Sequence, residues 1–255
     1  MLKPPMPTQS TVRSLGAAAI ACLLVACGGD KPERQVAGGA DDIYQRAQRS
    51  MNGGNYRDAI FVFEQLESRY PFSAVGKQSQ LDLIYCYYKS GSKEQVLDAS
   101  DQFVRENPTH PRVDYALYIK ALALFDRPPG PLDGVLNVDR ADRPPNDARR
   151  SFSTLRQLVE RYPASDYADD AVLRMRYIKD KLARYENRVA EYYMNRGAYV
   201  AALNRAQNSL KAYDGTPANQ RSLELMIEAY DALDLDDLAV STRAVLKKNF
   251  PDSDS

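Results

Sequence analysis

The chain has 255 residues, of which 44% are hydrophobic and 27% are charged, and its formal net charge is zero. Such a composition is ordinary for a globular protein and provides enough apolar material for one large or two small domains. The balanced charge gives no broad field that would attract nucleic acid. The single histidine, His110, excludes a histidine-rich metal site and disfavours a histidine-based catalytic triad.

The first predicted element is a signal peptide over residues 1–26. Positive charge precedes an apolar segment, residues 15–26, that is shorter than the roughly 20 residues a membrane-spanning helix needs. This segment ends in Leu24-Val25-Ala26-Cys27, which resembles the lipobox of bacterial lipoproteins. The resemblance implies that the Cys27 thiol is acylated and that its acyl chains hold the protein to membrane lipid. An ordinary signal peptide with an incidental cysteine is the alternative.

The residue after the cysteine predicts the destination. In lipoproteins of bacteria with two membranes, aspartate at this position usually means retention in the inner membrane. Gly28 therefore implies sorting to the outer membrane, on its periplasmic face. Residues 27–40, rich in glycine and charge, are predicted to form a lipidated flexible tether. Of the other cysteines, Cys22 leaves with the signal peptide, and the apolar neighbours of Cys86 predict a buried, unreactive thiol.

From residue 41 onward the chain is predicted to form helices in repeated pairs. Successive helical runs each close with Tyr-Pro or its equivalent, at Tyr70-Pro71, Asn107-Pro108, Tyr162-Pro163 and Phe250-Pro251. Proline stops a helix because its ring clashes with the preceding turn. The first two of these prolines are 37 residues apart, close to the period of about 34 in tetratricopeptide repeats. We predict an all-α, right-handed α-solenoid of five tetratricopeptide repeats; similar spacing without that packing is the alternative.

Small and large residues recur at the positions such repeats require. In the first unit, Gly54 is expected to end the first helix, while Ala47 and Ala59 let the two helices approach closely. Phe63 is expected to fill the gap to the next unit. The corresponding residues of later units are Tyr87 and Gly91, then Ala190, Tyr193, Gly197, Ala198, Tyr199 and Ala202, and finally Tyr230, Ala239 and Pro251.

The third unit is divided by an insertion. Prolines and glycines exclude a regular helix over residues 127–147. Residues 41–126 are therefore expected to hold units one and two with the first helix of unit three, and residues 148–255 to hold the remainder. The stretch 165–196 has neither proline nor glycine, which predicts an unusually long first helix in unit four.

No motif for catalysis, for a cofactor or for a metal emerges from the chain. It has no phosphate-binding glycine loop, no Cys-x-x-Cys and no His-Glu-x-x-His. Three acidic pairs, at Asp41-Asp42, Asp169-Asp170 and Asp236-Asp237, are expected at helix starts, where they complement exposed N–H groups. We predict that the protein is not an enzyme and binds polypeptides, because solenoids present long binding surfaces and its 17 tyrosines suit such surfaces.

Four segments are similar to the BamD family, the tetratricopeptide lipoproteins of the outer-membrane β-barrel assembly machinery. They read RYPFSAVGKQSQLDLIYCYYKSG, ENPTHPRVDYALY, VDRADRPPNDARRSF and ARYENRVAEYYMNRGAYVAALNR, and the likeness runs from about residue 42 to about residue 249. The phrases NPTHP and VDRADRP are not general repeat features. The resemblance implies a non-enzymatic scaffold that binds the barrel-inserting subunit, the smaller lipoproteins of the machinery and unfolded outer-membrane proteins.

The resemblance also implies roles for particular residues. The phrase YYMNRGAY implies contact with the membrane-proximal POTRA domain of the barrel-inserting subunit through Tyr192, Tyr193, Arg196, Gly197 and Tyr199. Arg196 is expected to form a bidentate salt bridge with a carboxylate there. The alternative is that it only complements the end of its helix. The amino-terminal repeats are implied to contact substrate segments through Tyr70, Phe72, Tyr85 and Tyr88.

Two stretches depart from the family pattern. Residues 212–217, AYDGTP, stand where another Tyr-Pro is expected, and the loop from 126 to 147 is unusually rich in proline, which leaves its contacts open. The alternative function is that of a tetratricopeptide lipoprotein adaptor in another envelope pathway, such as pilus or secretin assembly or the regulation of peptidoglycan hydrolases.

Overall fold

The computed structural model describes residues 37–125 and 145–251. The predicted signal peptide, Cys27, most of the tether and residues 126–144 lie outside these ranges. The described residues form ten α-helices and no strand, as the sequence predicted: α2 (Ala40–Asn52), α3 (Tyr56–Arg69), α4 (Ala74–Ser90), α5 (Lys93–Glu106), α6 (Val113–Leu124), α7 (Asn146–Arg161), α8 (Ala168–Met194), α9 (Tyr199–Ala212), α10 (Asn219–Ala232) and α11 (Asp236–Asn249).

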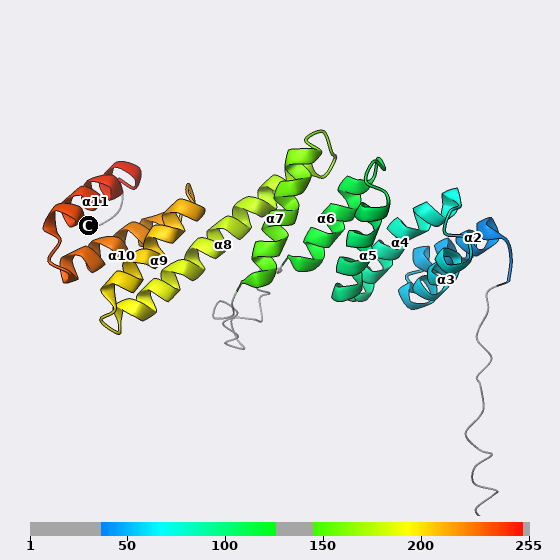
Figure 1. The fold of residues 1–255 in the computed structure, drawn as a ribbon, viewed down its shortest axis with the longest axis horizontal. Helices are drawn as coiled ribbons and strands as arrows, with labels where there is room; N and C mark the ends of the chain where they lie inside the picture. The colour runs from blue at the N-terminus through cyan, green and yellow to red at the C-terminus, as the bar shows by residue number, and fades with distance from the viewer. Residues whose placement is uncertain (1–36, 126–144, 252–255) are drawn as a thin grey trace, which may run out of the picture. The chain divides into compact units, whose positions relative to one another are not determined.

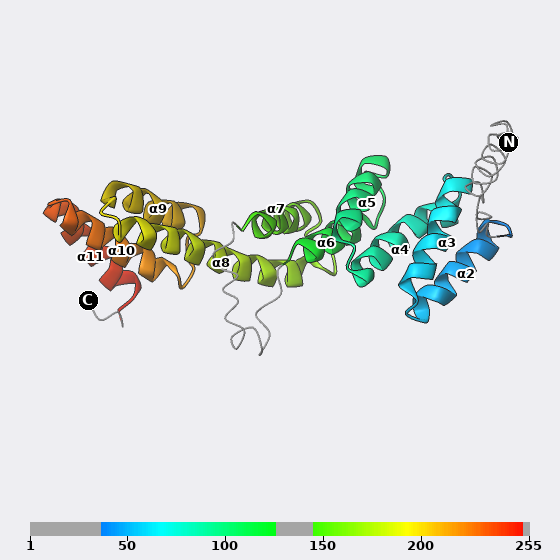
Figure 2. The ribbon, with the colours of Figure 1, turned by 90° about the horizontal axis from the view of Figure 1, so that it is seen from below.

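Each described helix packs against the helices that precede and follow it in the chain, as Figures 1 and 2 show. The first helices of neighbouring pairs also contact each other, in α2 with α4, α4 with α6 and α8 with α10. This pattern defines the pairs α2/α3, α4/α5, α6/α7, α8/α9 and α10/α11, so the predicted five-unit repeat is confirmed. The handedness of the solenoid stays a prediction.

Glycine ends the first helix of three pairs by adopting a left-handed backbone conformation. Gly54, Gly91 and Gly197 have φ angles of 76°, 77° and 70°. At the last of these, the Gly197 N–H donates to the Met194 carbonyl (2.9 Å) and the Ala198 N–H donates to the Tyr193 carbonyl (3.0 Å). The two bonds satisfy carbonyl groups that the end of a helix leaves without partners.

In the fifth pair the same turn is made by a residue other than glycine. Asp234 has a φ of 55°, and the following N–H, of Leu235, donates to the Tyr230 carbonyl at 3.0 Å. Aspartate tolerates this conformation better than most residues with a side chain. The hairpin is therefore preserved where the sequence offers no glycine to mark it.

Small side chains lie where the repeat pattern placed them. Ala47 and Ala59 are fully buried between α2 and α3, and Phe63 is also fully buried. Burying a phenylalanine side chain contributes roughly 1.5–3 kcal/mol. Ala190, Ala202, Ala206 and Leu225 form the corresponding core between α8, α9 and α10. The predicted small and turn positions are confirmed in both pairs and the large position in the first pair, whereas α9 has Ala206 at the position equivalent to Phe63.

Helix α8 is the longest described helix, at 27 residues or about 40 Å, as predicted. Its Glu186, only 1% exposed, accepts hydrogen bonds from Arg149 of α7 (3.1 Å) and from Arg205 of α9 (3.2 Å). A buried carboxylate is tolerated when cations compensate for its lost hydration. This bridge fixes the middle of α8 against both neighbouring helices.

Several smaller predictions can be checked in the described residues. The three acidic pairs lie in the first turns of α2, α8 and α11. Cys86 is fully buried, and burial raises the pKa of its thiol to about 12, which makes it unreactive. His110 lies in the turn between α5 and α6. Helix α7 begins at Asn146, slightly before the predicted end of the loop at residue 147.

Candidate partner-binding site

The turn between α8 and α9 carries all five residues that the sequence assigned to partner binding. We call residues 195–198 the Arg196 turn. Tyr192 and Tyr193 belong to the last turn of α8, and Tyr199 is the first residue of α9. Gly197 has a left-handed conformation, and a side chain added there would meet no atom within 4 Å. The glycine therefore shapes the turn and leaves open space beside Arg196.

Arg196 is exposed, and its guanidinium lies over the Tyr192 ring, 4.3 Å from the ring centroid. Tyr192 is 51% exposed and meets the edge of Tyr193 with ring centroids 5.7 Å apart. Tyr193 packs in turn against the core that Ala190 and Ala202 help to form. Within the described ranges, Arg196 has no ion pair with a carboxylate. The turn thus presents a cation whose position is restricted by an aromatic ring.

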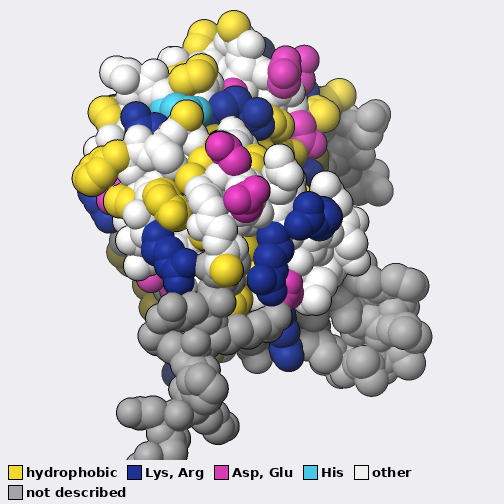
Figure 3. Space-filling view, turned by 90° about the vertical axis from the view of Figure 1, so that its right-hand side faces the viewer, with side chains coloured by type: hydrophobic (Ala, Val, Ile, Leu, Met, Phe, Trp, Pro, Cys, Tyr) yellow, Lys and Arg dark blue, Asp and Glu magenta, His cyan; other side chains and the backbone are white. Residues whose placement is uncertain are grey.

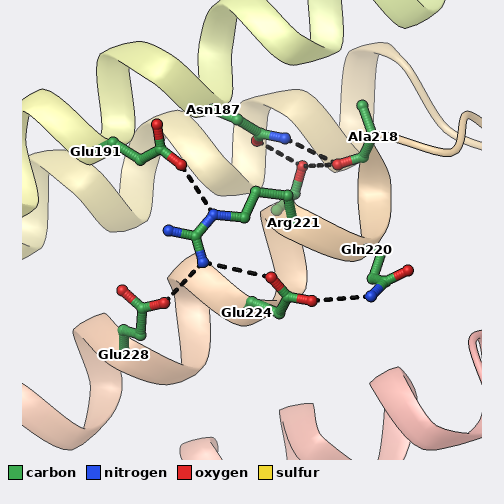
Figure 4. Close-up of polar contacts among 8 residues, drawn as sticks. Asn187, Glu191, Ala218, Gln220, Arg221, Glu224 and Glu228 are labelled. Carbon is green, nitrogen blue, oxygen red and sulfur yellow. Dashed lines mark hydrogen bonds and ion pairs between the residues drawn. The ribbon is translucent and has the colours of Figure 1, made fainter. Parts of the chain in front are cut away.

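A cluster of ion pairs lies close to this turn and joins α8 to α10 (Figure 4). The Arg221 guanidinium donates to Glu191 of α8 at 2.8 Å, and to Glu224 and Glu228 of its own helix at 3.3 and 2.8 Å. Burial alone would lower the pKa of Arg221, but its bonds to Glu191 and Glu228 raise it above its usual value. Arg221 therefore stays charged and holds the end of α8 in place.

Buried polar contacts lie under the ion pairs and join the same two helices (Figure 4). The Asn187 amide donates to the Ala218 carbonyl at 2.8 Å, and the Ser222 hydroxyl donates to the Asn187 Oδ1 at 2.7 Å. Asn187 is 4% exposed and Ser222 is fully buried. Buried hydrogen bonds of this kind are costly to break, because water cannot replace the lost partner. They fix α8 against the start of α10 about two helical turns before the Arg196 turn.

The four residues assigned to substrate contact do not form one site. Tyr70 and Phe72, 36% and 94% exposed, lie in the turn between α3 and α4. Tyr85 and Tyr88 lie near the other end of α4, at least about 18 Å along the helix axis. The end of the stack that carries α2 to α4 shows hydrophobic side chains scattered among charged ones rather than gathered in one groove (Figure 3).

Tyr85 and Tyr88 also have different surroundings. Tyr85 meets the edge of Tyr56 with ring centroids 6.3 Å apart, and the Lys89 ammonium lies 5.9 Å from each ring centroid. Tyr88 lines a cavity of about 410 Å³ together with Val96, Leu122 and Phe125. The structure thus places these four aromatic residues in three settings: an exposed turn, a cation–aromatic contact and a cavity lined by apolar residues together with Lys93 and Arg174.

An aromatic and polar contact between α6 and α8 was not predicted. Tyr118 stacks on Tyr167 with centroids 4.6 Å apart, and its hydroxyl donates to Asp170 at 2.7 Å. Arg174 also donates to Asp170, and its guanidinium lies 4.9 Å from the Phe125 centroid. Burial alone would raise the pKa of Asp170, but bonds from Arg174 and Tyr118 lower it. These side chains thus join α6, the first helix of the third pair, to the start of α8, the first helix of the fourth pair.

A partly buried carboxylate on α4 was also missed. Asp82 accepts hydrogen bonds from the Tyr44 hydroxyl (2.9 Å) and from the amides of Gln48 (2.7 Å) and Gln78 (3.2 Å). Burial raises the pKa of Asp82, and these bonds offset the effect only in part. Burial, followed by the charge of Asp82, raises the pKa of Tyr44 to about 12. The sequence did contain a signal for this site, because Asp82 is the one charged residue within the apolar stretch LDLIYCYY.

The described residues show neither a metal-binding arrangement nor a membrane-spanning helix. No group of histidine, cysteine or acidic side chains in residues 37–125 and 145–251 is placed to hold a metal ion. No helix in the same ranges is both long and apolar enough to cross a bilayer.

Comparison with a family profile and with individual known proteins gives matches that agree with one another. A family profile described as "YfiO: Outer membrane lipoprotein" matches residues 37–246. A protein of Neisseria meningitidis serogroup B named "Outer membrane protein assembly factor BamD" is 44% identical over 213 residues, which cover 84% of this chain and 80% of that protein. The protein of the same name from Vibrio cholerae is 39% identical, and the match covers 81% of this chain and 86% of that protein. The one from Haemophilus influenzae is 35% identical, and the match covers 93% of this chain and 90% of that protein.

Proposed function

Because the chain belongs to the YfiO family of outer membrane lipoproteins, whose curated relatives are BamD assembly factors, we propose that the Arg196 turn binds the barrel-inserting subunit of the assembly machinery. The protein is a non-enzymatic outer membrane assembly factor. The proposal names the surface through which the protein binds its partner and the contact that forms there. The partner's membrane-proximal POTRA domain supplies a carboxylate, which accepts two hydrogen bonds from the Arg196 guanidinium.

The observation that best supports this proposal is that the Arg196 guanidinium is exposed and has no ion pair among the described residues. Arg205 and Arg221 form ion pairs that hold neighbouring helices together, and Arg174 and Arg184 pair with aspartates of their own helix. Arg196 instead is exposed and rests on Tyr192. A guanidinium already ordered by a ring loses less freedom when it binds, which favours association. Exposed Tyr192 and Val200 supply apolar area beside it.

The test compares two substitutions at this position. Arg196→Glu reverses the charge, and we expect binding of the purified barrel-inserting subunit to weaken by about tenfold to a hundredfold. Arg196→Lys keeps the charge and loses the bidentate geometry, so we expect a smaller loss. Arg57→Glu is the matched control, because Arg57 is exposed beside the equivalent turn of the first pair. Equal binding by Arg196→Glu and the control would remove the turn from the interface.

The turn between α3 and α4 is the proposed first contact for unfolded outer-membrane segments. Phe72 is almost fully exposed, and Tyr70 lies two residues before it. Aromatic side chains provide large contact areas at low conformational cost. We expect Phe72→Ala to lower the cross-linking of unfolded barrel segments, measured with a photoreactive group at the exposed position Ala74 in both forms. Unchanged cross-linking would exclude Phe72 as a contact. Tyr85 and Tyr88 belong to the same proposal as separate, later contacts.

The proposed anchor is the acylated Cys27, which lies outside the described residues. A tether of residues 28–39 can reach at most about 40 Å before α2 begins. The repeats would therefore stay close to the periplasmic face of the outer membrane. The smaller lipoproteins of the machinery are further proposed partners, to which we assign no surface.

A further inference from the structure

A small groove is lined by residues of α3, α4 and α5. Its volume is about 180 Å³, below the roughly 300–1,000 Å³ of most small-molecule sites. Leu83 of α4 and Phe103 of α5 are almost fully buried and form its apolar base. Glu67 of α3 and Asp98 of α5 are more exposed and stand at its rim. We call this cavity the α3–α5 groove.

The groove lies on the side of α4 opposite Asp82. The Gln80 amide lines the groove and donates to Glu67 of α3 at 3.3 Å and to Glu106 of α5 at 3.2 Å. Asp82 instead accepts hydrogen bonds from α2, and residues two apart on a helix do not share a face. The Asn107 amide donates to the Gln80 Oε1 at 3.1 Å. Gln80 thus holds carboxylates from both sides of the groove in place.

Two further carboxylates are bonded to side chains that line the groove. Glu64 accepts from the Tyr87 hydroxyl at 2.7 Å, and Glu106 accepts from the Gln102 amide at 2.9 Å. Burial, followed by the bond to Glu64 and by the charges of Glu64 and Glu67, raises the pKa of the Tyr87 hydroxyl. The field of these carboxylates therefore reaches into the groove.

No cation compensates for this negative charge. Within residues 37–125 and 145–251, neither lysine nor arginine forms an ion pair with Glu64, Glu67, Asp98 or Glu106. Their hydrogen-bond donors are the neutral groups of Tyr87, Gln80 and Gln102. A carboxylate elsewhere on α5 shows the contrast, because Asp101 pairs with Lys120 of α6 at 2.5 Å.

The corresponding positions in later pairs are mostly not acidic. The second helices can be aligned on the residues that end them: Tyr70, Asn107, Tyr162, Tyr213 and Phe250. The positions of Glu64 and Glu67 then correspond to Asp101 and Val104, to Arg156 and Val159, and to Gln207 and Leu210. Those of Asp98 and Glu106 correspond to Ser153 and Arg161, to Asn204 and Ala212, and to Ser241 and Asn249. Uncompensated negative charge on both sides therefore distinguishes the first groove.

We propose that the α3–α5 groove binds an arginine side chain from an extended segment of a partner polypeptide. The guanidinium lies between Glu67 and Asp98, while the aliphatic stem contacts Leu83 and Phe103. Long cationic side chains commonly bury such a stem and keep the charged end near the surface. Arginine fits better than lysine because its planar group donates to two carboxylates at once.

The shape of the site favours this occupant over other cations. The acidic side chains of the described ranges are not placed to hold a metal ion, so the negative charge is spread along the groove. A guanidinium has five N–H donors and bonds in several directions, which suits carboxylates on two walls. The volume admits one side chain rather than a folded surface. This contact is independent of the Arg196 turn.

The test follows the backbone amide signals of the isotope-labelled mature chain by NMR during titration with the capped peptide Ala-Leu-Arg-Leu-Ala. We expect shifts at Leu83, Ala99 and Phe103. A matched peptide with citrulline, which has nearly the shape of arginine but no charge, should bind at least about tenfold more weakly. The lysine peptide should bind with intermediate affinity. Spermidine, a cation without a peptide backbone, should bind more weakly than the arginine peptide.

Substitutions in the groove test the contacts. Glu67→Gln combined with Asp98→Asn should lower the affinity for the arginine peptide by about tenfold and abolish its advantage over the citrulline peptide. Asp101→Asn is the matched control, because it removes a carboxylate of the same helix that already has a cation. It should leave the affinity unchanged.

The peptide comparison uses the unaltered chain, so it tests the role of charge even if the double variant folds poorly. Equal affinity for the arginine and citrulline peptides would overturn the proposal. So would unchanged affinity in a folded double variant, shifts confined to other helices, or spermidine binding as tight as that of the arginine peptide.

Discussion

Replacing Gly76 by alanine tests how the α3–α4 turn is built. Gly76 is a buried residue in the first turn of α4. A Cβ atom at this position would lie 2.4 Å from the Tyr70 carbonyl oxygen and 3.0 Å from the Ser73 Oγ. The same Ser73 hydroxyl donates to that carbonyl at 2.9 Å and accepts from the Gly76 N–H at 2.9 Å. The added methyl group therefore forces the whole turn to move.

The expected change in the free energy of unfolding follows from three contributions. Overpacking costs about 1–3 kcal/mol, and a weakened Ser73 cap costs about 1 kcal/mol. Alanine gains about 1 kcal/mol over glycine in a helix. The net expectation is destabilisation by about 1–3 kcal/mol, measured by urea unfolding of the mature chain with circular dichroism.

A matched control separates this clash from backbone strain. Gly54→Ala changes a glycine with a φ of 76° and no atom near the added Cβ, so only the conformational cost of about 1–2 kcal/mol applies. Gly76→Ala, in contrast, should also alter substrate cross-linking, because Tyr70 and Phe72 belong to the displaced turn. If Gly76→Ala stabilised the chain, as helix propensity alone would predict, the described turn would be wrong.

Three further predictions concern buried charge and the anchor. Glu186→Gln leaves Arg149 and Arg205 without their shared carboxylate and should destabilise the chain by about 1–3 kcal/mol in urea unfolding; no change would show that the bridge is dispensable. Asp82→Asn should raise the melting temperature at pH 7, because the raised pKa means that the folded state disfavours the Asp82 carboxylate. This gain should disappear at about pH 3, where Asp82 is itself protonated, and a pH-independent gain would contradict the cause given. Cys27→Ser should move the protein from the membrane to the soluble fraction, and persistent membrane attachment would exclude Cys27 as the anchor.

The helical pairs were predictable because their signals are local. Gly54, Gly91 and Gly197 end helices through their own backbone conformation, and proline after Tyr70 or Tyr162 stops a helix whatever surrounds it. The fifth turn shows the limit of this reasoning. Asp234 adopts the left-handed conformation that the turn requires, and no residue type nearby announces it.

The contacts that shape the candidate site were less predictable because they join distant residues. Glu186 meets Arg149 and Arg205, which lie 37 and 19 residues away, and nothing in their spacing shows that the three converge. The tyrosines illustrate the same limit. Tyr88 faces a cavity and Tyr192 faces solvent, although both occur in Tyr-Tyr pairs, since tyrosine suits either environment.

The most direct test of the central claim is a charge exchange between Arg196 and the barrel-inserting subunit. Each carboxylate on the surface of its membrane-proximal POTRA domain is changed in turn to arginine and titrated against the Arg196→Glu chain. We expect one of these changes to raise the affinity of the POTRA domain for the Arg196→Glu chain by at least about tenfold. The same change should weaken the binding of the POTRA domain to the unaltered chain. If no exchange restores binding, or if Arg196→Glu binds as tightly as the unaltered chain, then Arg196 does not form the proposed salt bridge.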